Sequence, residues 1–273
     1  MRAQYEPVSM PDTQRRTLKS VHVGATYEIR ISLPHRYDVS GERYPVVYLL
    51  DGNGLFGVAT EMLRLLDFFG GMRQVIVVGI AYPDVRTFPE TMGLRTRDYT
   101  PTDEGWYRRA YESTDGAPPY VGEGGADRFL SFVCDEVVPF LESEYHASSA
   151  ERVLAGYSFG GLAVLKALFS RHDVFHRFLV SSPSLWWGDG VIARLEADYA
   201  DHHEDLAAWV YMATGANEGD DMGPPMESLA ETLRARDYPS LTLTARLLED
   251  ETHLTAFPAF LSRAFIAAFD RGE

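Results

Sequence analysis

The feature that most constrains the fold is an alternation between short β-rich apolar runs and longer stretches with helical spacing. We expect strands at 45–50, 74–82, 152–156, 177–182, 208–214 and 241–248. We expect helices at 57–69, 126–145, the stretch after Gly160, 190–200, 225–237 and 256–269. Central runs such as 75–78 are apolar on both faces, as in strands that helices cover from above and below. The alternation therefore predicts a doubly wound, mostly parallel sheet.

The start of the chain has a different pattern. Residues 18–24 and 26–34 alternate apolar and polar side chains around Gly24. This alternation indicates an antiparallel hairpin with one solvated face. With the hairpin included, we predict a single α/β domain over residues 1–273, with about eight strands and helices on both faces of the sheet.

One segment interrupts the alternation. Residues 84–123 have little periodicity and are rich in Pro, Gly, Arg and aromatic side chains. A loop of this length inside a compact domain is usually functional. We expect an inserted lid or a wall of the substrate pocket; a disordered excursion is the alternative.

The chain is acidic, with a formal net charge of −15 over 273 residues and a pI of about 4.9. Such a chain repels phosphate backbones and anionic membrane surfaces, so we expect no nucleic-acid partner and no membrane partner. An anionic substrate would need a local cationic pocket. The sequence specifies no oligomeric state.

The single cysteine, Cys134, excludes a disulfide within the chain. Its helical spacing with Val137 and Leu141 predicts a buried small hydrophobe. Residues 1–16 lack the apolar core of a signal peptide. No window approaches the ~18 apolar residues that a membrane span needs. We therefore expect a cytoplasmic location.

Ser158 lies in a Gly-x-Ser-x-Gly pentapeptide between the expected strand at 152–156 and the helix after Gly160. Glycines at 156 and 160 let the backbone turn sharply and push the serine oxygen outward. The helix N-terminus also directs N–H groups toward this position. We predict that Ser158 is a nucleophile; a glycine-rich turn without chemistry is the alternative.

A serine nucleophile needs a base, and in this strand–turn–helix arrangement the chain order is serine, acid, histidine. The histidines after Ser158 are His172, His176, His202, His203 and His253. The first two follow the helix at its end remote from the serine. The adjacent pair at 202–203 lies in a charged run and would point about 100° apart on a helix, which disfavours a metal site. His253 follows the last strand, and we predict that it is the general base.

The acid of the triad should follow the strand at 208–214 and orient the imidazole. Glu218, Asp220 and Asp221 all qualify. We choose Glu218 because it is nearest the end of the strand, and the other two remain alternatives.

Two backbone N–H groups are needed to stabilise the oxyanion of the tetrahedral intermediate. One should be the amide of Phe159, directly after the nucleophile, and the other should come from the loop after the strand at 45–50. Gly52 and Gly54 in that loop permit unusual backbone angles, so the amide of Asn53 is the candidate donor. A simple Asp-Gly-Asn-Gly turn is the compatible, less specific interpretation.

Several of these stretches together resemble the esterase D-like branch of the α/β hydrolases, over roughly residues 18–270. They are "YPVVYLLDG", "GYSFGG", "SPSLWW" and the late histidine. The branch includes siderophore lactone esterases, feruloyl esterases, S-formylglutathione hydrolases and mycolyl transferases. The segments "GLRTRDYTPT" and "GGADRFLSFVCDEVVPFLE" are most similar to the siderophore-esterase group, whose known members cleave enterobactin or bacillibactin. The resemblance implies an α/β-hydrolase fold with a catalytic triad.

The resemblance also implies residues of the substrate pocket. It makes Arg97 and Asp98 pocket residues and puts Trp186 and Trp187 near the substrate, with Tyr157 beside the serine. The tryptophans could stack on an aromatic substrate or cap the core. The acid loop matches the family only loosely, and the His-Gly-Gly-Gly loop of lipases is absent, so we do not expect long-chain lipase activity.

Four arginines concentrate positive charge near the pocket, namely Arg95, Arg97, Arg108 and Arg109. They could hold a carboxylate or an anionic iron–catecholate complex, or they could pair with the acidic residues nearby.

The sequence as a whole predicts a serine-dependent carboxylic ester hydrolase that forms an acyl-enzyme and needs no metal and no organic cofactor. Its substrate would be a small-molecule ester such as a siderophore lactone or an aryl ester. The alternatives are an acyltransferase with the same triad and a catalytically silent binding protein on a hydrolase scaffold.

Overall fold

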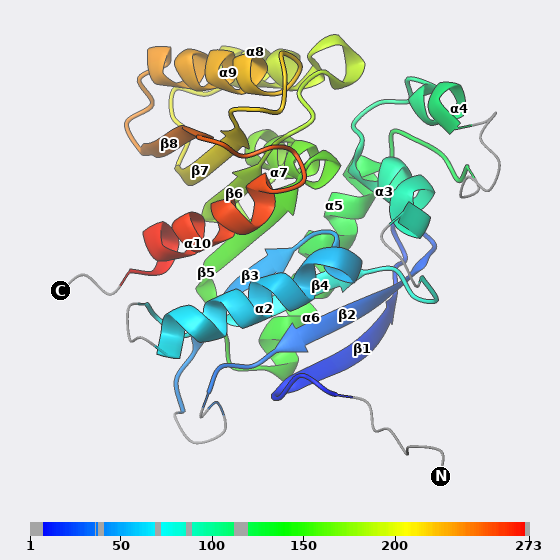
Figure 1. Cartoon of the computed structure of the whole chain (residues 1–273), viewed down its shortest axis with the longest axis vertical. Coiled ribbons are helices and arrows are strands. Elements are labelled where there is room, and N and C mark those ends of the chain that lie inside the picture. The colour runs from blue at the N-terminus through cyan, green and yellow to red at the C-terminus, as the bar shows by residue number, and fades with distance from the viewer. Residues whose placement is uncertain are drawn as a thin grey trace.

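The structure, a computed structural model, describes residues 8–35, 37, 41–68, 72–85, 89–111 and 120–270. Its centre is an eight-stranded sheet with the strand order β1-β2-β4-β3-β5-β6-β7-β8 (Figure 1). The strands are β1 (Thr13–Lys19), β2 (Thr26–Ser32), β3 (Tyr44–Leu49), β4 (Ile76–Ala81), β5 (Ala147–Tyr157), β6 (Arg177–Ser181), β7 (Ala208–Gly215) and β8 (Leu241–Leu248). β2 runs antiparallel to β1 and to β4, and the other neighbours are parallel. The predicted fold class is therefore confirmed.

The first strand of the hairpin lies earlier in the chain than expected. β1 covers Thr13–Lys19 instead of 18–24, because residues 20–25 form the turn, where the Ser20 amide donates to the Ala25 carbonyl at 2.9 Å. β1 is an edge strand whose side chains are exposed or half-buried. A strand without a buried face has no hydrophobic alternation to mark its limits.

The helices are α2 (Gly52–Phe68), α3 (Met92–Tyr99), α4 (Trp106–Tyr111), α5 (Ala126–Phe132), α6 (Val138–Glu144), α7 (Phe159–Ser170), α8 (Val191–His202), α9 (Gly223–Ala235) and α10 (Ala256–Phe269). A π-helical turn (Val133–Val137) joins α5 to α6, and it contains the buried Cys134. Short 3₁₀ turns cover Pro89–Thr91 and Trp187–Asp189. Among the described residues, no helix has both the length and the apolar character to cross a membrane.

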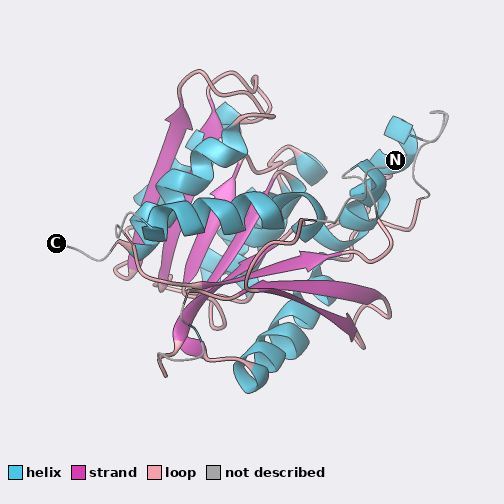
Figure 2. Cartoon of the chain, turned by 60° about the horizontal axis from the view of Figure 1, so that its bottom comes forward, coloured by secondary structure: helices cyan, strands magenta, loops and turns pink. Residues whose placement is uncertain are grey.

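Helices cover both faces of the sheet (Figure 2). Successive residues of β3 point to opposite faces, so Val47 packs with α2 and α10, whereas Val46 and Tyr48 pack with α5, α6 and α7. Figure 1 shows α2 and α10 together in front of the sheet. The central strands are buried on both sides, which explains why they read as continuous apolar runs.

The segment expected as a loop at 84–123 contains two short helices, α3 and α4. Its parts at 86–88 and 112–119 lie outside the described residues. The face that α3 buries carries polar side chains, among them Arg95 and Asp98. Helical periodicity is read from apolar residues, so a helix with a polar buried face leaves no such pattern in the sequence.

Candidate active site

Ser158 lies on the turn that joins the end of β5 to the start of α7. Its backbone has φ 60° and ψ −117°, a strained conformation for a residue with a side chain. The turn is tight: a Cβ atom on Gly156 would lie 2.4 Å from the carbonyl carbon and oxygen of Gly160. Gly156 therefore allows a close approach that a residue with a side chain could not make, and the turn presents Ser158 at the carboxyl edge of the sheet.

We expect Gly156→Ala to lower the free energy of unfolding by about 3 kcal/mol, because the added methyl group overlaps the backbone of Gly160. Gly57→Ala is the matched control. Gly57 lies in α2 with open space around its Cα, so the same substitution should raise the free energy of unfolding by about 0.5–1 kcal/mol. Urea unfolding of both variants tests this. Equal effects at the two sites would contradict the tight packing of the turn.

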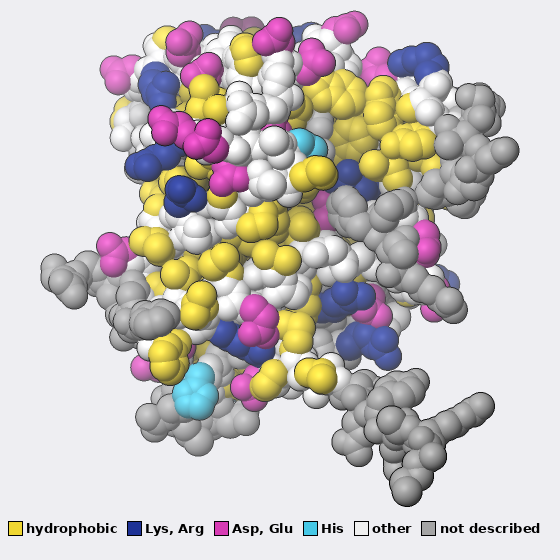
Figure 3. Space-filling view, in the orientation of Figure 1, with side chains coloured by type: hydrophobic (Ala, Val, Ile, Leu, Met, Phe, Trp, Pro, Cys, Tyr) yellow, Lys and Arg dark blue, Asp and Glu magenta, His cyan; other side chains and the backbone are white. Residues whose placement is uncertain are grey.

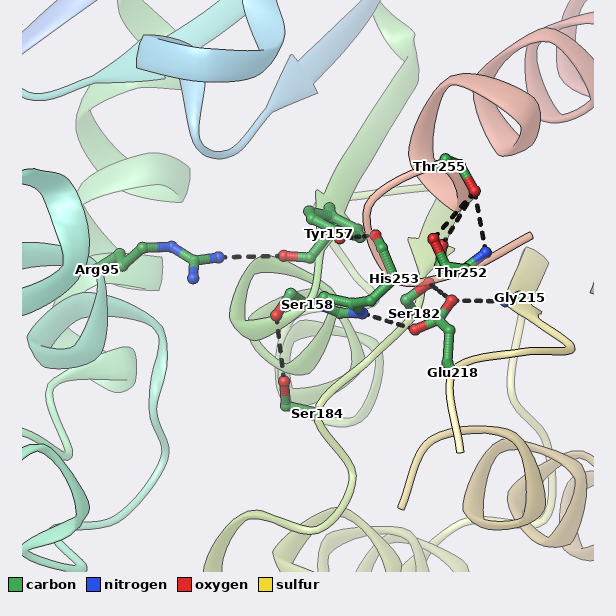
Figure 4. Close-up of polar contacts among 10 residues, drawn as sticks. All are labelled: Arg95, Tyr157, Ser158, Ser182, Ser184, Gly215, Glu218, Thr252, His253 and Thr255. Atoms are coloured by element: carbon green, nitrogen blue, oxygen red, sulfur yellow. Dashed lines mark hydrogen bonds and ion pairs between the residues drawn. The ribbon is translucent and has the colours of Figure 1, made fainter. Parts of the chain in front are cut away.

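Glu218 and His253 come from the loops after β7 and β8 and form a hydrogen-bonded pair (Figure 4). His253 Nδ1 donates to Glu218 Oε2 at 2.6 Å. The second carboxylate oxygen, Oε1, accepts from Ser182 Oγ and from the Gly215 amide, both at 2.6 Å. Of the three acids considered for this role, the structure brings Glu218 to the histidine.

The Glu218 side chain is fully buried. Burial by itself would raise its pKa, but the hydrogen bonds from His253, Ser182 and the Gly215 amide outweigh it and hold the pKa below the ordinary value of 4.5. Glu218 therefore remains a carboxylate and accepts the hydrogen bond from His253 Nδ1.

The depressed pKa of Glu218 makes a pH-dependent contribution to stability. Because the pKa is lower in the folded state, the ionised carboxylate stabilises the fold above pH 4.5, and this contribution is lost as the pH falls through the folded-state pKa. We expect Glu218→Gln to lower the free energy of unfolding by about 1.5–3 kcal/mol at pH 7, and by less at pH 4.

Urea unfolding at the two pH values measures this difference. Glu249→Gln is the control, because Glu249 is an exposed carboxylate in the loop after β8. It should change the free energy of unfolding by less than about 0.5 kcal/mol at both pH values. A Glu218→Gln effect that grows at acid pH would contradict the sign of the shift.

Tyr157, predicted to bind substrate, packs against the loop that carries His253. Its ring stacks on the His253 ring at 4.8 Å, and its hydroxyl donates to the His253 carbonyl oxygen. Phe257 of α10 contacts the same tyrosine ring at 5.4 Å. Tyr157 is absent from the described residues that line the cleft, and it holds the loop that carries His253.

The hydroxyl of Ser158 lies 3.4 Å from the hydroxyl of Ser184. Among the described residues, no hydrogen bond joins Ser158 to His253, although both line one cleft. Figure 4 shows the His253 ring between Ser158 and Glu218 in that view. Hydrogen bonds of active-site residues are often loose or absent without substrate.

The cleft has a volume of about 400 Å³. Its apolar lining comprises Met92, Trp106, Phe159, Trp186 and Met222. Its polar lining comprises Arg95, Ser158, Ser184, Glu218, Asp221 and His253. Figure 3 shows hydrophobic side chains gathered over the region where Figure 1 places α3, α4 and α7. The cleft thus places Ser158, Glu218 and His253 beside the aromatic side chains of Trp106, Phe159 and Trp186.

The two adjacent tryptophans have different surroundings. Trp186 lines the cleft, and its ring lies 5.7 Å from that of Trp106. Trp187 is fully buried, and its Nε1 donates to the Thr102 carbonyl oxygen at 3.2 Å. The structure therefore brings only Trp186 of this pair to the cleft.

The candidate oxyanion donors both lie at helix N-termini. Asn53 is the second residue of α2 and Phe159 the first residue of α7, and N–H groups of a first turn have no acceptor within their helix. The Asn53 side chain bonds both the amide and the carbonyl of Tyr82, at 2.7 and 2.9 Å, which fixes the loop. Phe159 lines the cleft; Asn53 is not among the described residues that do.

Arg97 and Asp98, expected in the pocket, pair with each other. Arg97 Nε donates to Asp98 Oδ1 at 2.6 Å, and the Tyr27 hydroxyl donates to Asp98 Oδ2 at 2.6 Å. Neither residue is among the described lining of the cleft. The pair ties α3 to β2.

Arg95 is the arginine of α3 that lines the cleft, and it makes a buried ion pair with Asp51. Its Nε and Nη2 donate to the two carboxylate oxygens at 2.9 and 2.8 Å, and Nη2 also donates to the Tyr157 carbonyl oxygen at 3.3 Å. One guanidinium thus connects the loop after β3 to the turn that bears the serine.

Sequence reasoning missed several residues of the site. They are Asp51, Met92, Trp106, Ser182, Ser184 and Met222. Ser182 and Ser184 lie in "SPSLWW", one of the stretches that carry the family resemblance, but no local pattern shows that one hydroxyl contacts Glu218 and the other Ser158.

Comparison with known proteins gives the family. The chain matches the family model described as "Putative esterase" over residues 20–264. It is 29% identical over 269 residues to the ferri-bacillibactin esterase BesA of Bacillus subtilis, which covers 94% of this chain and 89% of the relative. It is 36% identical over 170 residues to a siderophore enterobactin esterase of Emericella nidulans, which covers 60% of this chain and 55% of the relative.

A solved structure agrees with these relatives. The crystal structure of the BES protein from Bacillus cereus superposes with a TM-score of 0.83 at 26% identity, covering 98% of this chain and 99% of that one. The resemblance inferred from the motifs is therefore confirmed. Since the family model matches most of the chain, the chain belongs to this esterase family of the α/β-hydrolase fold and hydrolyses a small-molecule ester.

Proposed function

We propose that this esterase is serine-dependent and cleaves its substrate through an acyl-enzyme, with Ser158 as nucleophile, His253 as general base and Glu218 as the orienting acid. The observation that carries the proposal is the 2.6 Å hydrogen bond between His253 and the buried Glu218, in a cleft that also contains Ser158 on its strained turn. A buried carboxylate on Nδ1 leaves Nε2 as the nitrogen for proton transfer.

The reaction follows from these roles. Ser158 Oγ attacks the ester carbonyl carbon while His253 takes its proton, and the amides of Asn53 and Phe159 stabilise the oxyanion. The tetrahedral intermediate then expels the alcohol, which receives the proton from His253, and leaves an acyl-serine. A water molecule, deprotonated by His253, attacks this ester and releases the acid and the free serine.

The segment at 84–123 forms one wall of the substrate pocket in this proposal. The support is that Met92, Arg95 and Trp106, all from its described part, line the cleft. The substrate is a siderophore lactone or an aryl ester. The relatives' names refer to bacillibactin and enterobactin, and the aromatic side chains of the cleft suit a planar acyl group.

Hydrolysis is proposed over transfer to another alcohol because the matching family and relatives are esterases, and the His253 side chain is 40% exposed, so water can reach the base. A fluorophosphonate probe with intact-mass analysis is the direct test. One adduct per chain, lost in Ser158→Ala, would support the mechanism, whereas no adduct would indicate a silent binding protein. Product analysis with added alcohol separates the outcomes: the free acid supports a hydrolase, and a new ester supports an acyltransferase.

A panel of substrates then tests the substrate class. It contains a tricatecholate trilactone, a feruloyl ester and acetyl to octanoyl esters. We expect the highest kcat/KM for the two substrates that carry an aromatic ring on the acyl side of the ester bond, the tricatecholate trilactone and the feruloyl ester. A steady rise in kcat/KM with aliphatic chain length would contradict this expectation.

A further inference from the structure

The arginines near the active site are engaged by neighbouring groups. Arg97 pairs with Asp98 at 2.6 Å, and Arg109 Nη1 donates to the Glu104 carbonyl oxygen at 2.6 Å. The Arg108 guanidinium lies 4.7 Å from the centre of the Tyr120 ring. None of these three is among the described residues that line the cleft, so they give the substrate no direct cationic contact.

Arg95 does line the cleft, but its charge is balanced. It makes two hydrogen bonds with Asp51, and the side chains of the pair are 3% and 0% exposed. A bidentate ion pair at these distances presents little net charge to a ligand. Removing Arg95 from Asp51 to bind a substrate anion would leave a buried carboxylate unpaired, which is costly.

The opposite side of the cleft is acidic. Glu218 is bonded to His253, and next to it Asp221 lines the cleft with an exposed carboxylate. In the part of the chain that the structure describes, no hydrogen bond or ion pair of the Asp221 carboxylate is recorded. The chain as a whole has a net charge of −15. The exposed Asp221 and the net charge of the chain both favour a negative potential at the cleft.

Three of the remaining described lining residues are aromatic, namely Trp106, Phe159 and Trp186. The rings of Trp106 and Trp186 lie 5.3 and 5.9 Å from the ring of Phe159, which follows the nucleophile. Such rings contact an uncharged planar group favourably, and they carry no positive charge that could pair with a fixed anion.

We propose that the cleft selects neutral aromatic esters over anionic ones, and that Asp221 at its rim is the residue that sets this preference. The inference rests on the proposed serine esterase function and narrows its substrate class. An iron-free tricatecholate trilactone is uncharged while its catechols are protonated, whereas its Fe(III) complex carries three negative charges. The proposal therefore assigns the iron-free form, and neutral aryl esters in general, to this enzyme.

The test compares 4-nitrophenyl benzoate with 4-nitrophenyl 4-sulfobenzoate, which differ only in the sulfonate. At low ionic strength we expect kcat/KM to be about tenfold or more higher for the neutral ester. The ratio of kcat/KM for the neutral ester to kcat/KM for the sulfonated ester should fall about threefold in Asp221→Asn and about tenfold in Asp221→Lys. In both variants the ratio falls because kcat/KM for the sulfonated ester rises. In 1 M salt the ratio should collapse, because screening acts over about 3 Å there.

Glu231→Gln is the matched control, since it removes the same charge from an exposed position more than two turns into α9. Glu231→Gln should change the ratio of the two kcat/KM values by less than half as much as Asp221→Asn does. The iron-free and Fe(III) forms of a tricatecholate trilactone provide a second pair with the same expected order.

Two outcomes would overturn the proposal. In the first, the wild-type protein cleaves the sulfonated ester with a kcat/KM equal to or higher than that for the neutral ester. In the second, Asp221→Lys leaves the ratio of the two kcat/KM values unchanged. Either can occur while Ser158-dependent hydrolysis stands. Failure of the proposed function looks different, because neither ester would then be cleaved in a way that depends on Ser158.

Discussion

Replacing Ser158 by alanine is expected to lower kcat/KM on a neutral aryl ester by a factor on the order of 10⁴–10⁶. In the proposed mechanism the variant loses the atom that forms the acyl bond, and only the proposed oxyanion donors and the binding contacts of the cleft remain. His253→Ala should have an effect of similar size, because the hydroxyl is a weak nucleophile without its base. The double variant should be no worse than either single one, since the two residues act as a unit. Steady-state kinetics on all three variants gives the comparison.

Ser184→Ala is the control for this series. Ser184 is buried and lies 3.4 Å from the nucleophile, but the proposed mechanism gives it no bond to make or break. Its loss should lower kcat/KM by about tenfold or less. The assignment of the nucleophile would be contradicted if Ser158→Ala were as active as Ser184→Ala. It would also be contradicted if the losses of kcat/KM in Ser158→Ala and His253→Ala multiplied in the double variant.

The second large effect is on stability. Arg95→Leu is expected to lower the free energy of unfolding by about 3–5 kcal/mol, because it leaves the carboxylate of Asp51 buried without a partner. Arg73→Ala, which breaks the more exposed pair with Glu151, should cost less than about 1 kcal/mol. Urea unfolding of both variants measures the difference between a buried and a surface ion pair.

A compensating change separates the buried charge from simple loss of packing. Asp51 has φ 56°, a left-handed conformation that asparagine tolerates, so Asp51→Asn removes the charge without a new backbone strain. Adding it to Arg95→Leu should restore more than half of the lost free energy. If the double variant were as unstable as Arg95→Leu alone, the destabilisation would come from the cavity and not from the charge.

The strands and most helices of the fold could be predicted from local pattern. Buried strands such as β4 are apolar on both faces, and helices such as α10 repeat their apolar residues along one side. The prediction was wrong or incomplete where a strand has no buried apolar face or where a helix buries polar side chains. β1 is an exposed edge, and α3 buries Arg95 and Asp98, which find their partners on β2 and on the loop after β3.

In the candidate site, too, the sequence identifies some residues and not others. Ser158 is marked by glycines that are its neighbours in sequence, and His253 by its position after the last strand. No local pattern in the sequence identifies the residues that line the cleft. Trp186 and Trp187 are adjacent and chemically identical, yet one lines the cleft and the other is part of the core.

By itself the sequence determined the α/β architecture, the turn that carries Ser158 and the order of serine, acid and histidine along the chain. These features depend on backbone conformation and on the repeat of apolar side chains, both of which are local properties. The tertiary structure decided which acid meets His253, which arginine meets Asp51 and which tryptophan meets the cleft. Glu218 and His253 are 35 residues apart, and Arg95 and Asp51 are 44 apart. Such pairs form only when the packed sheet brings separate loops to one edge, so the chemistry of the site depends on the complete fold.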